Sequence, residues 1–214
     1  MENNTGGAKS ELGERGRFVQ LGGPKVKTLR EIVLHQYDLQ TALQLLVALN
    51  SKSLRNEVRK GLWHHAITVY YKCFKHNDAR RRLWPQIVYA TRRDFLTTFN
   101  FFQDLRDKHI VHDDNPYIRA YVGAISNEPG KEIKVKEVIS GVAVLDVLEE
   151  SKWRMFSELV RYAVEWIGKE RTRMQDAIKR EFEEKSYEEL CSLEELAIKV
   201  PTIDQVSSKK SSDE

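Results

Sequence analysis

The sequence predicts a mainly α-helical protein, a bundle of helices with one small inserted β-hairpin. Three observations carry this prediction. Apolar residues recur at intervals of three and four over most of the region 25–199, as in helices that bury one face. The period changes to two only near 117–139, where we expect the hairpin. Polar, aperiodic segments flank this region, so we expect a single domain between a disordered leader at 1–24 and a disordered tail at 200–214.

The composition is that of a soluble protein of mixed charge. Of the 214 residues, 41% are hydrophobic and 31% are charged, and 35 basic against 32 acidic residues give a net charge of +3. So small an excess does not indicate nucleic-acid binding, which needs basic side chains gathered on one face. The N-terminus lacks the apolar segment of a signal peptide, and no run approaches the roughly 18 apolar residues of a membrane helix. We expect a cytoplasmic protein without membrane contact, whose Cys73 and Cys191 are free thiols.

Two helices are expected in the first third of the chain. The first begins with Thr28 as its N-cap and Glu31 three residues later, the pattern of a capping box. The second opens near Ser53 and is apolar on nearly all sides, which suits the centre of a bundle. Its main stripe consists of Leu54, Val58, Leu62, Ala66, Val69 and Cys73.

A third helix is expected from about Pro85 or Gln86 to about Ile110, and Asn115-Pro116 blocks its continuation. The hairpin follows. Its strands come from "YIRAYVGAIS" and "KEIKVKEVIS", which alternate apolar and polar residues, and "NEPGKE" between them has turn chemistry. The next segment, "GVAVLD", is either a third short strand or the lead into the next helix.

The last long helical pattern begins near Asp146. It forms either one helix or two helices joined by a kink near Gly168. A stripe of this length usually packs in a bundle or across a dimer. We therefore interpret its apolar residues as core rather than as a cofactor site, and no cofactor is expected.

Reactive side chains are concentrated at the end of the third helix. Three interpretations compete for the group that consists of Arg106, Asp107, His109, His112, Asp113 and Asp114. The first is a solvated helix end, where basic side chains meet the partial negative charge of the helix C-terminus. The second is a metal site, since His109 and His112 stand three apart with Asp113 beside them. Two histidines at this spacing do not make a complete ligand set, so no metal is expected.

The third interpretation is phosphodiester cleavage by an Arg/His pair. A ribonuclease that works without metal needs a base for the proton of the 2′-hydroxyl and an acid for the leaving oxygen. Histidine serves both roles because its pKa lies near neutrality. Such an enzyme also needs a fixed cation for the charge of the transition state, and arginine offers a planar fork of donors to phosphate oxygens.

The segment "LRDKHIVH", from Leu105 to His112, resembles the signature of HEPN domains (higher eukaryotes and prokaryotes nucleotide-binding). In that signature an arginine and a polar residue precede a histidine, and Arg106, Asp107 and His112 match. The wider similarity is to the bacterial abortive-infection and toxin-like branch, over about Thr28 to Gly168. Branches paired with a nucleotidyltransferase antitoxin carry a tyrosine two residues after the histidine. Here that position is Asp114, so regulation through such a tyrosine is not implied.

The resemblance implies a bundle of four or five helices and commonly a homodimer that brings two copies of the motif into one cleft. It also implies a metal-independent endoribonuclease of a toxin or phage-defence system, with an antitoxin or defence protein as a further partner. Other members have lost activity and only bind RNA, nucleotides or proteins, so a non-catalytic binding module is the alternative. The hairpin is an insertion in a plain helical bundle, and covering the cleft, extending the dimer or binding a partner all fit it.

Two further points concern the site. Arg106 and His112 lie six positions apart, roughly 240° around an ideal helix, so the helix must end between them or a second chain must complete the site. His109, three positions from Arg106, shares its face and remains a rival for the catalytic role. The run formed by Arg80, Arg81 and Arg82, with Lys75, Arg92 and Arg93 near it, is either a solvated face or a surface for RNA phosphates. Trp84 beside it either stacks on a base or anchors the loop.

Overall fold

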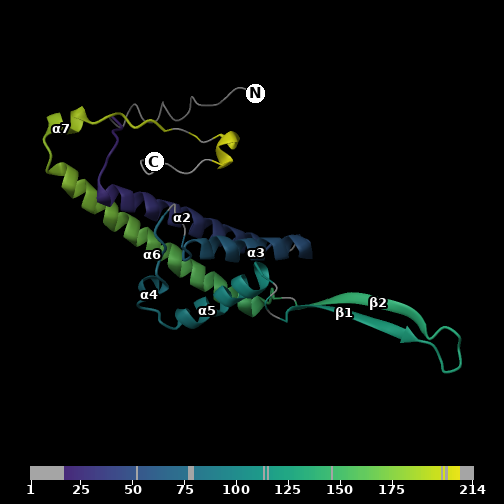
Figure 1. Ribbon diagram of the computed structural model, residues 1–214. Coiled ribbons are helices and arrows are strands. Elements are labelled where there is room, and N and C mark those ends of the chain that lie inside the picture. Colours follow the sequence, from purple (N-terminus) through teal and green to yellow (C-terminus); the bar gives the residue numbers. More distant parts are fainter. Residues whose placement is uncertain are drawn as a thin grey trace. The chain divides into compact units, whose positions relative to one another are not determined.

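The computed structural model describes residues 17–51, 53–76, 80–112, 114, 116–145, 147–198, 200 and 202–207. Within these residues the fold is mainly helical with one two-stranded antiparallel sheet, as predicted (Figure 1). None of the described helices is both long enough and apolar enough to cross a membrane. The chain forms two compact units. We call His35–Asn77 with Arg82–Ile167 the core unit, and Met1–Leu34, Asp78–Arg81 and Gly168–Glu214 the terminal unit.

The core unit holds most of the elements, and helices α2 and α6 each contribute to both units. In chain order the elements of this unit are α2 (Pro24–Ala48, from His35 on), α3 (Asn56–Lys72), α4 (Pro85–Val88), α5 (Phe95–Leu105), η1 (Arg106–Ile110), β1 (Ile118–Ser126), β2 (Val135–Val144) and α6 (Glu150–Glu183, as far as Ile167).

Aromatic side chains form the centre of the core unit. Trp63 of α3 is fully buried and meets Phe102 of α5 and Phe156 of α6 edge to face, with ring centroids 5.8 and 5.5 Å apart. This geometry suits the charge distribution of aromatic rings, and burying one such side chain stabilises the fold by about 1.5–3 kcal/mol. The hydroxyls of Tyr70 and Tyr89 hydrogen-bond to each other, and that of Tyr89 donates to the Leu159 carbonyl at 3.2 Å. The core therefore joins α3, α5 and α6, and the buried hydroxyls of Tyr70 and Tyr89 find their partners within it.

Two predictions about helix boundaries are wrong. The first helix begins at Pro24, not at Thr28, whose hydroxyl donates to the Pro24 carbonyl at 3.0 Å inside the helix. Proline suits the first helical position because its φ is already helical and its missing N–H has no partner there. The expected third helix is also divided, since α4 ends at Val88 and α5 begins at Phe95. Tyr89, buried and bonded to α3 and α6, holds the chain in the turn between these two helices.

The predicted hairpin is confirmed. Strands β1 and β2 pair antiparallel, from Ile118 opposite Val144 to Ser126 opposite Val135. "GVAV" belongs to β2, so the hairpin ends at Val144 rather than near 139, and the described residues of this segment form no separate third strand. Nearly all side chains of both strands are exposed, and Figure 1 shows the hairpin projecting from the helices of the core unit. The backbone N–H of Leu145 donates to the Tyr117 carbonyl at 2.8 Å and closes the base.

Helix α6 settles the alternative left open at its glycine, because it runs from Glu150 to Glu183 through Gly168 without a break. In the terminal unit, Lys25 pairs with Glu181 at 2.7 Å, and Val19 forms a single β-bridge with Glu195. The unit also contains α7 (Tyr187–Ser192) and the 3₁₀-helix η2 (Ile203–Ser207). Of the expected leader and tail, residues 1–16 and 208–214 lie outside the described residues. Cys73 is buried and Cys191 exposed, and both are free thiols.

Candidate functional site

The candidate site begins where α5 changes into a wider helical turn. The buried residues Phe95, Phe99, Phe102 and Leu105 fix α5 against the core. From Arg106 to Ile110 the chain is a π-helix, in which the N–H of Val111 donates to the Arg106 carbonyl at 3.0 Å. Single π-helical turns inside α-helices are rare and often lie at functional sites. The helix ends at Ile110, so the chain leaves it between Arg106 and His112.

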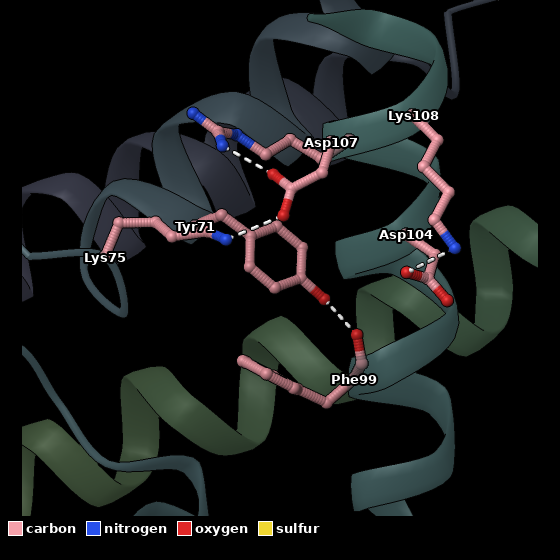
Figure 2. Close-up of polar contacts among 7 residues, drawn as sticks. Tyr71, Lys75, Phe99, Asp104, Asp107 and Lys108 are labelled. Carbon is pink, nitrogen blue, oxygen red and sulfur yellow. Dashed lines mark hydrogen bonds and ion pairs between the residues drawn. The ribbon is translucent and has the colours of Figure 1, made fainter. Parts of the chain in front are cut away.

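Three charged side chains meet on this turn. Arg106 Nη1 donates to Oδ1 of Asp107, and Lys75 Nζ donates to Oδ2 of the same carboxylate, both at 2.6 Å (Figure 2). Each oxygen of Asp107 thus binds one cation. We call these residues the Lys-Asp-Arg cluster. The side chains of Arg106 and Lys75 are 24% and 38% exposed, so solvent and ligands reach them.

Lys75 reaches the cluster from the segment that follows α3. It lies three residues after Lys72, the last residue of that helix, and its backbone N–H still donates to the Tyr71 carbonyl at 3.1 Å. Tyr71 is buried, and its hydroxyl donates to the Phe99 carbonyl of α5 (Figure 2). This contact links the end of α3 to α5 and helps hold Lys75 beside Asp107. On the other side of η1, Lys108 pairs with Asp104 at 3.1 Å.

The charges of the cluster affect two ionisable groups. Partial burial alone would raise the pKa of Asp107, but the hydrogen bonds and charges of Lys75 and Arg106 outweigh it and lower that pKa below its ordinary value. Burial raises the pKa of the Tyr71 phenol, and the nearby Tyr89, Asp107 and Asp104 raise it further. At neutral pH Asp107 is therefore ionised and Tyr71 keeps its proton, which makes Tyr71 unsuitable as an acid or base.

The two histidines of the segment have different surroundings. His109 is buried, and its ring meets those of His64 and Tyr117 edge to face, with centroids 6.1 and 5.3 Å apart. Among the described residues its Nδ1 has no hydrogen-bond partner. His109 thus links η1 to α3 and to the base of the hairpin. His112 lies beyond the helix and is exposed to solvent.

The remaining predicted residues lie elsewhere. Arg80 is buried in the terminal unit, where Arg81 pairs with Glu31 at 3.0 Å. Arg82 belongs to the core unit, and its guanidinium lies 3.8 Å from the centroid of the exposed Trp84 ring. Within the described part of the chain, no three His, Cys, Asp or Glu side chains are grouped for a metal ion, and Asp113 lies outside that part.

Sequence patterns gave no reason to place Lys75 beside Arg106. In the sequence Lys75 stands near the basic run that follows it, and its partner Asp107 is 32 positions away. A local pattern carries no signal for such a contact. Comparisons with protein-family models, curated proteins and solved structures gave no match to this chain. The arrangement itself offers two cations held by one carboxylate, together with an exposed imidazole six residues after the arginine, a set suited to an anionic ligand such as phosphate.

Proposed function

We propose that this protein is an HEPN-like, metal-independent endoribonuclease that cleaves RNA with Arg106 and His112. One observation carries the proposal most directly. Arg106 is held by Asp107 at a π-helical turn, and an exposed histidine, His112, lies two residues after the end of that helix. A guanidinium fixed in this way needs little rearrangement to meet charge that develops on a phosphate.

The proposed reaction is transfer of the phosphodiester to the neighbouring 2′-oxygen. A base removes the proton of the 2′-hydroxyl, the 2′-oxygen bonds to phosphorus, and the bond to the 5′-oxygen breaks as that oxygen receives a proton. The products are a 2′,3′-cyclic phosphate and a 5′-hydroxyl. Arg106 stabilises the negative charge on the phosphorane-like transition state. His112 acts as the general acid or base, and Asp107 orients Arg106.

His112 suits this role better than His109 because RNA reaches an exposed imidazole. His109 is packed between the rings of His64 and Tyr117, where it positions the turn that bears Arg106. Each chain then offers one accessible imidazole at the motif, whereas the reaction uses an acid and a base. A homodimer in which two copies of the motif share a cleft supplies both.

The resemblance to the abortive-infection and toxin-like branch suggests a toxin or phage-defence effector, with an antitoxin or defence protein as a further partner. The exposed apolar residues of the hairpin also support the binding of a protein partner. An isolated two-stranded hairpin is marginally stable in water. Here one face of the hairpin carries mostly apolar side chains. These side chains are exposed to solvent: Ile118, Ala120, Val122, Ala124, Val138, Val142 and Val144.

The alternative is a non-catalytic HEPN-like module that binds RNA, a nucleotide or a partner protein. One observation favours it. Among the described residues, none makes a hydrogen bond or ion pair with the His112 side chain, whereas catalytic histidines are commonly held by a second group.

An RNA-cleavage assay in EDTA tests the proposal. We expect the wild-type protein to cut single-stranded RNA and leave 2′,3′-cyclic phosphate ends. Replacing the acid-base group in His112→Ala should lower the rate about 10²- to 10⁴-fold. Loss of transition-state stabilisation in Arg106→Ala should lower it about 10²- to 10³-fold.

Two variants serve as matched controls. His65→Ala removes an exposed histidine of α3 that is not part of the motif, and Arg154→Ala removes an exposed arginine that pairs with Glu150. Both should cut at the wild-type rate. Equal rates in all five proteins, or no cleavage by the wild type, would contradict a ribonuclease that uses this pair. RNA binding without cleavage, unchanged in His112→Ala, would favour the binding module.

A further inference from the structure

We propose that Lys75 and Arg106 together form a binding site for a backbone phosphate of single-stranded RNA, with Asp107 as the clamp that spaces them. This deepens the proposed function, since it names the ligand of that site and adds a residue from outside the Arg/His segment. The carrying observation is that one carboxylate binds both cations, each through a different oxygen and each at 2.6 Å.

The donors in the cluster exceed what Asp107 uses. An ammonium group has three N–H donors and a guanidinium has five. The bonds to Asp107 occupy one donor of Lys75 and one of Arg106. Further donors on both groups can bind an anion while the carboxylate stays in place. Two positive charges and one negative charge leave the cluster with a net charge of +1, which matches the single negative charge of one phosphodiester.

The positions of the two cations favour a phosphodiester. A phosphodiester has two unesterified oxygens and can accept a bond from each of two neighbouring cations, as Asp107 does within the chain. Arginine and lysine are the usual residues for such contacts. Both side chains are partly exposed, so a ligand can reach them.

Preorganisation strengthens this site. A free lysine side chain loses rotamer freedom when it binds a ligand, and this loss weakens binding. Lys75 is already held by Asp107, so part of that loss occurs when the chain folds. Lys72 and Lys108 also pair with carboxylates, but Lys75 shares its carboxylate with Arg106, so two cations are held side by side.

The salt dependence of RNA binding tests this inference. The probe is a fluorescent pool of short single-stranded RNA of random sequence, and every protein carries His112→Ala so that the RNA stays intact. For single strands, log Kd changes with log salt concentration by about 0.7 per phosphate contact. We expect Lys75→Met to bind several-fold more weakly at low salt and to lower this slope by about 0.7. Lys75→Arg should retain the slope, because it keeps a cation at that position.

Lys72→Met is the matched control. Lys72 is the last residue of α3, three positions before Lys75, and pairs with Asp38 at 3.3 Å, so this variant removes the same charge away from the cluster. Its slope should equal that of the parent protein. If Lys75→Met also keeps the parent slope, Lys75 contacts no phosphate, and a lowered melting temperature would then reflect the lost ion pair alone.

Failure of this inference and failure of the ribonuclease are distinguishable. Cleavage is measured separately, on proteins that retain His112. Binding with the lowered slope but without cleavage contradicts the enzyme and supports the phosphate site. Cleavage with an unchanged slope contradicts only the phosphate site, and a protein that neither binds nor cuts RNA contradicts both.

Discussion

At the scale of single residues, Asp107 determines how the cations around it are arranged. The same residue orients the arginine next to it in sequence and fixes a lysine from the segment that follows α3. Without the carboxylate, the two cations would repel each other and the flexible lysine stem would turn toward solvent. The arrangement therefore depends on the ionised form of Asp107, which makes it sensitive to acid.

A comparison of the wild type with Asp107→Asn at different pH values tests this dependence. In the folded chain the pKa of Asp107 lies below its ordinary value of about 3.9, because the bonds from Lys75 and Arg106 outweigh the effect of partial burial. A group whose pKa is lowered by folding stabilises the fold above its unfolded pKa, and this contribution is lost as the pH falls through its folded pKa. We expect the wild type to be more stable than the variant at neutral pH by less than about 1 kcal/mol.

Urea denaturation from about pH 7 down to about pH 3 measures this difference, and we expect it to shrink only in the acidic part of the range. Asp104→Asn, which removes the partner of Lys108, is measured in parallel as a control for the general loss of one negative charge. A difference between the wild type and Asp107→Asn that stays constant over the whole range would contradict the interpretation.

At the scale of elements, the π-helical turn and the hairpin set the surroundings of the site. The turn follows directly on Leu105, the last buried residue of α5, and within it the buried His109 remains in contact with His64 of α3. The Tyr117 ring then packs on His109, and the hairpin begins at the next residue. The hairpin is thus attached directly beside the site, although its own side chains are largely exposed.

Removing the hairpin tests how independent it is of the helices. Because the Tyr117 carbonyl and the Leu145 N–H are already bonded at 2.8 Å, a short Gly-Ser link can replace Ile118–Val144. We expect the helical part to unfold cooperatively and within about 0.5 kcal/mol of the full chain, as for changes away from the core. Far-UV circular dichroism during thermal unfolding is the measurement. Loss of the cooperative transition would show that the hairpin supports the helices.

At the scale of the whole molecule, the main question is how many copies assemble. The proposed chemistry uses an acid and a base, and each chain offers one exposed histidine at the motif. The hairpin adds an exposed apolar face, and apolar faces of this kind often mark interfaces. Both features favour a dimer.

Light scattering after size exclusion checks the assembly. We expect twice the chain mass of 25.0 kDa at micromolar concentration. The variant without the hairpin, measured alongside, shows whether the hairpin carries the contact between the copies. A wild-type mass equal to one chain would contradict the dimer and would require one chain to supply both catalytic groups.

Much of the fold follows from local patterns in the sequence. The change of period near residue 118 and the turn chemistry of "NEPGKE" predicted the hairpin, because alternation and turn propensity act over a few residues. The apolar stripe after Asp146 likewise predicted a long helix. The start of the first helix at Pro24 is a local effect of proline, but the division of the third helix arose where a distant contact outweighs the local pattern. Tyr89 holds a turn that apolar spacing alone would continue as helix.

The candidate site was likewise predictable from the sequence only in part. Arg106, Asp107, His109 and His112 were recognisable because they lie within one short segment. The sequence by itself determined a mainly helical chain with one hairpin and placed a dense set of reactive groups at the end of one helix. Only the tertiary structure decided that His109 is buried, that His112 is exposed and that Lys75 joins Asp107. Periodicity specifies which face of a helix is buried, but the packing of the whole core selects which distant side chain meets that face.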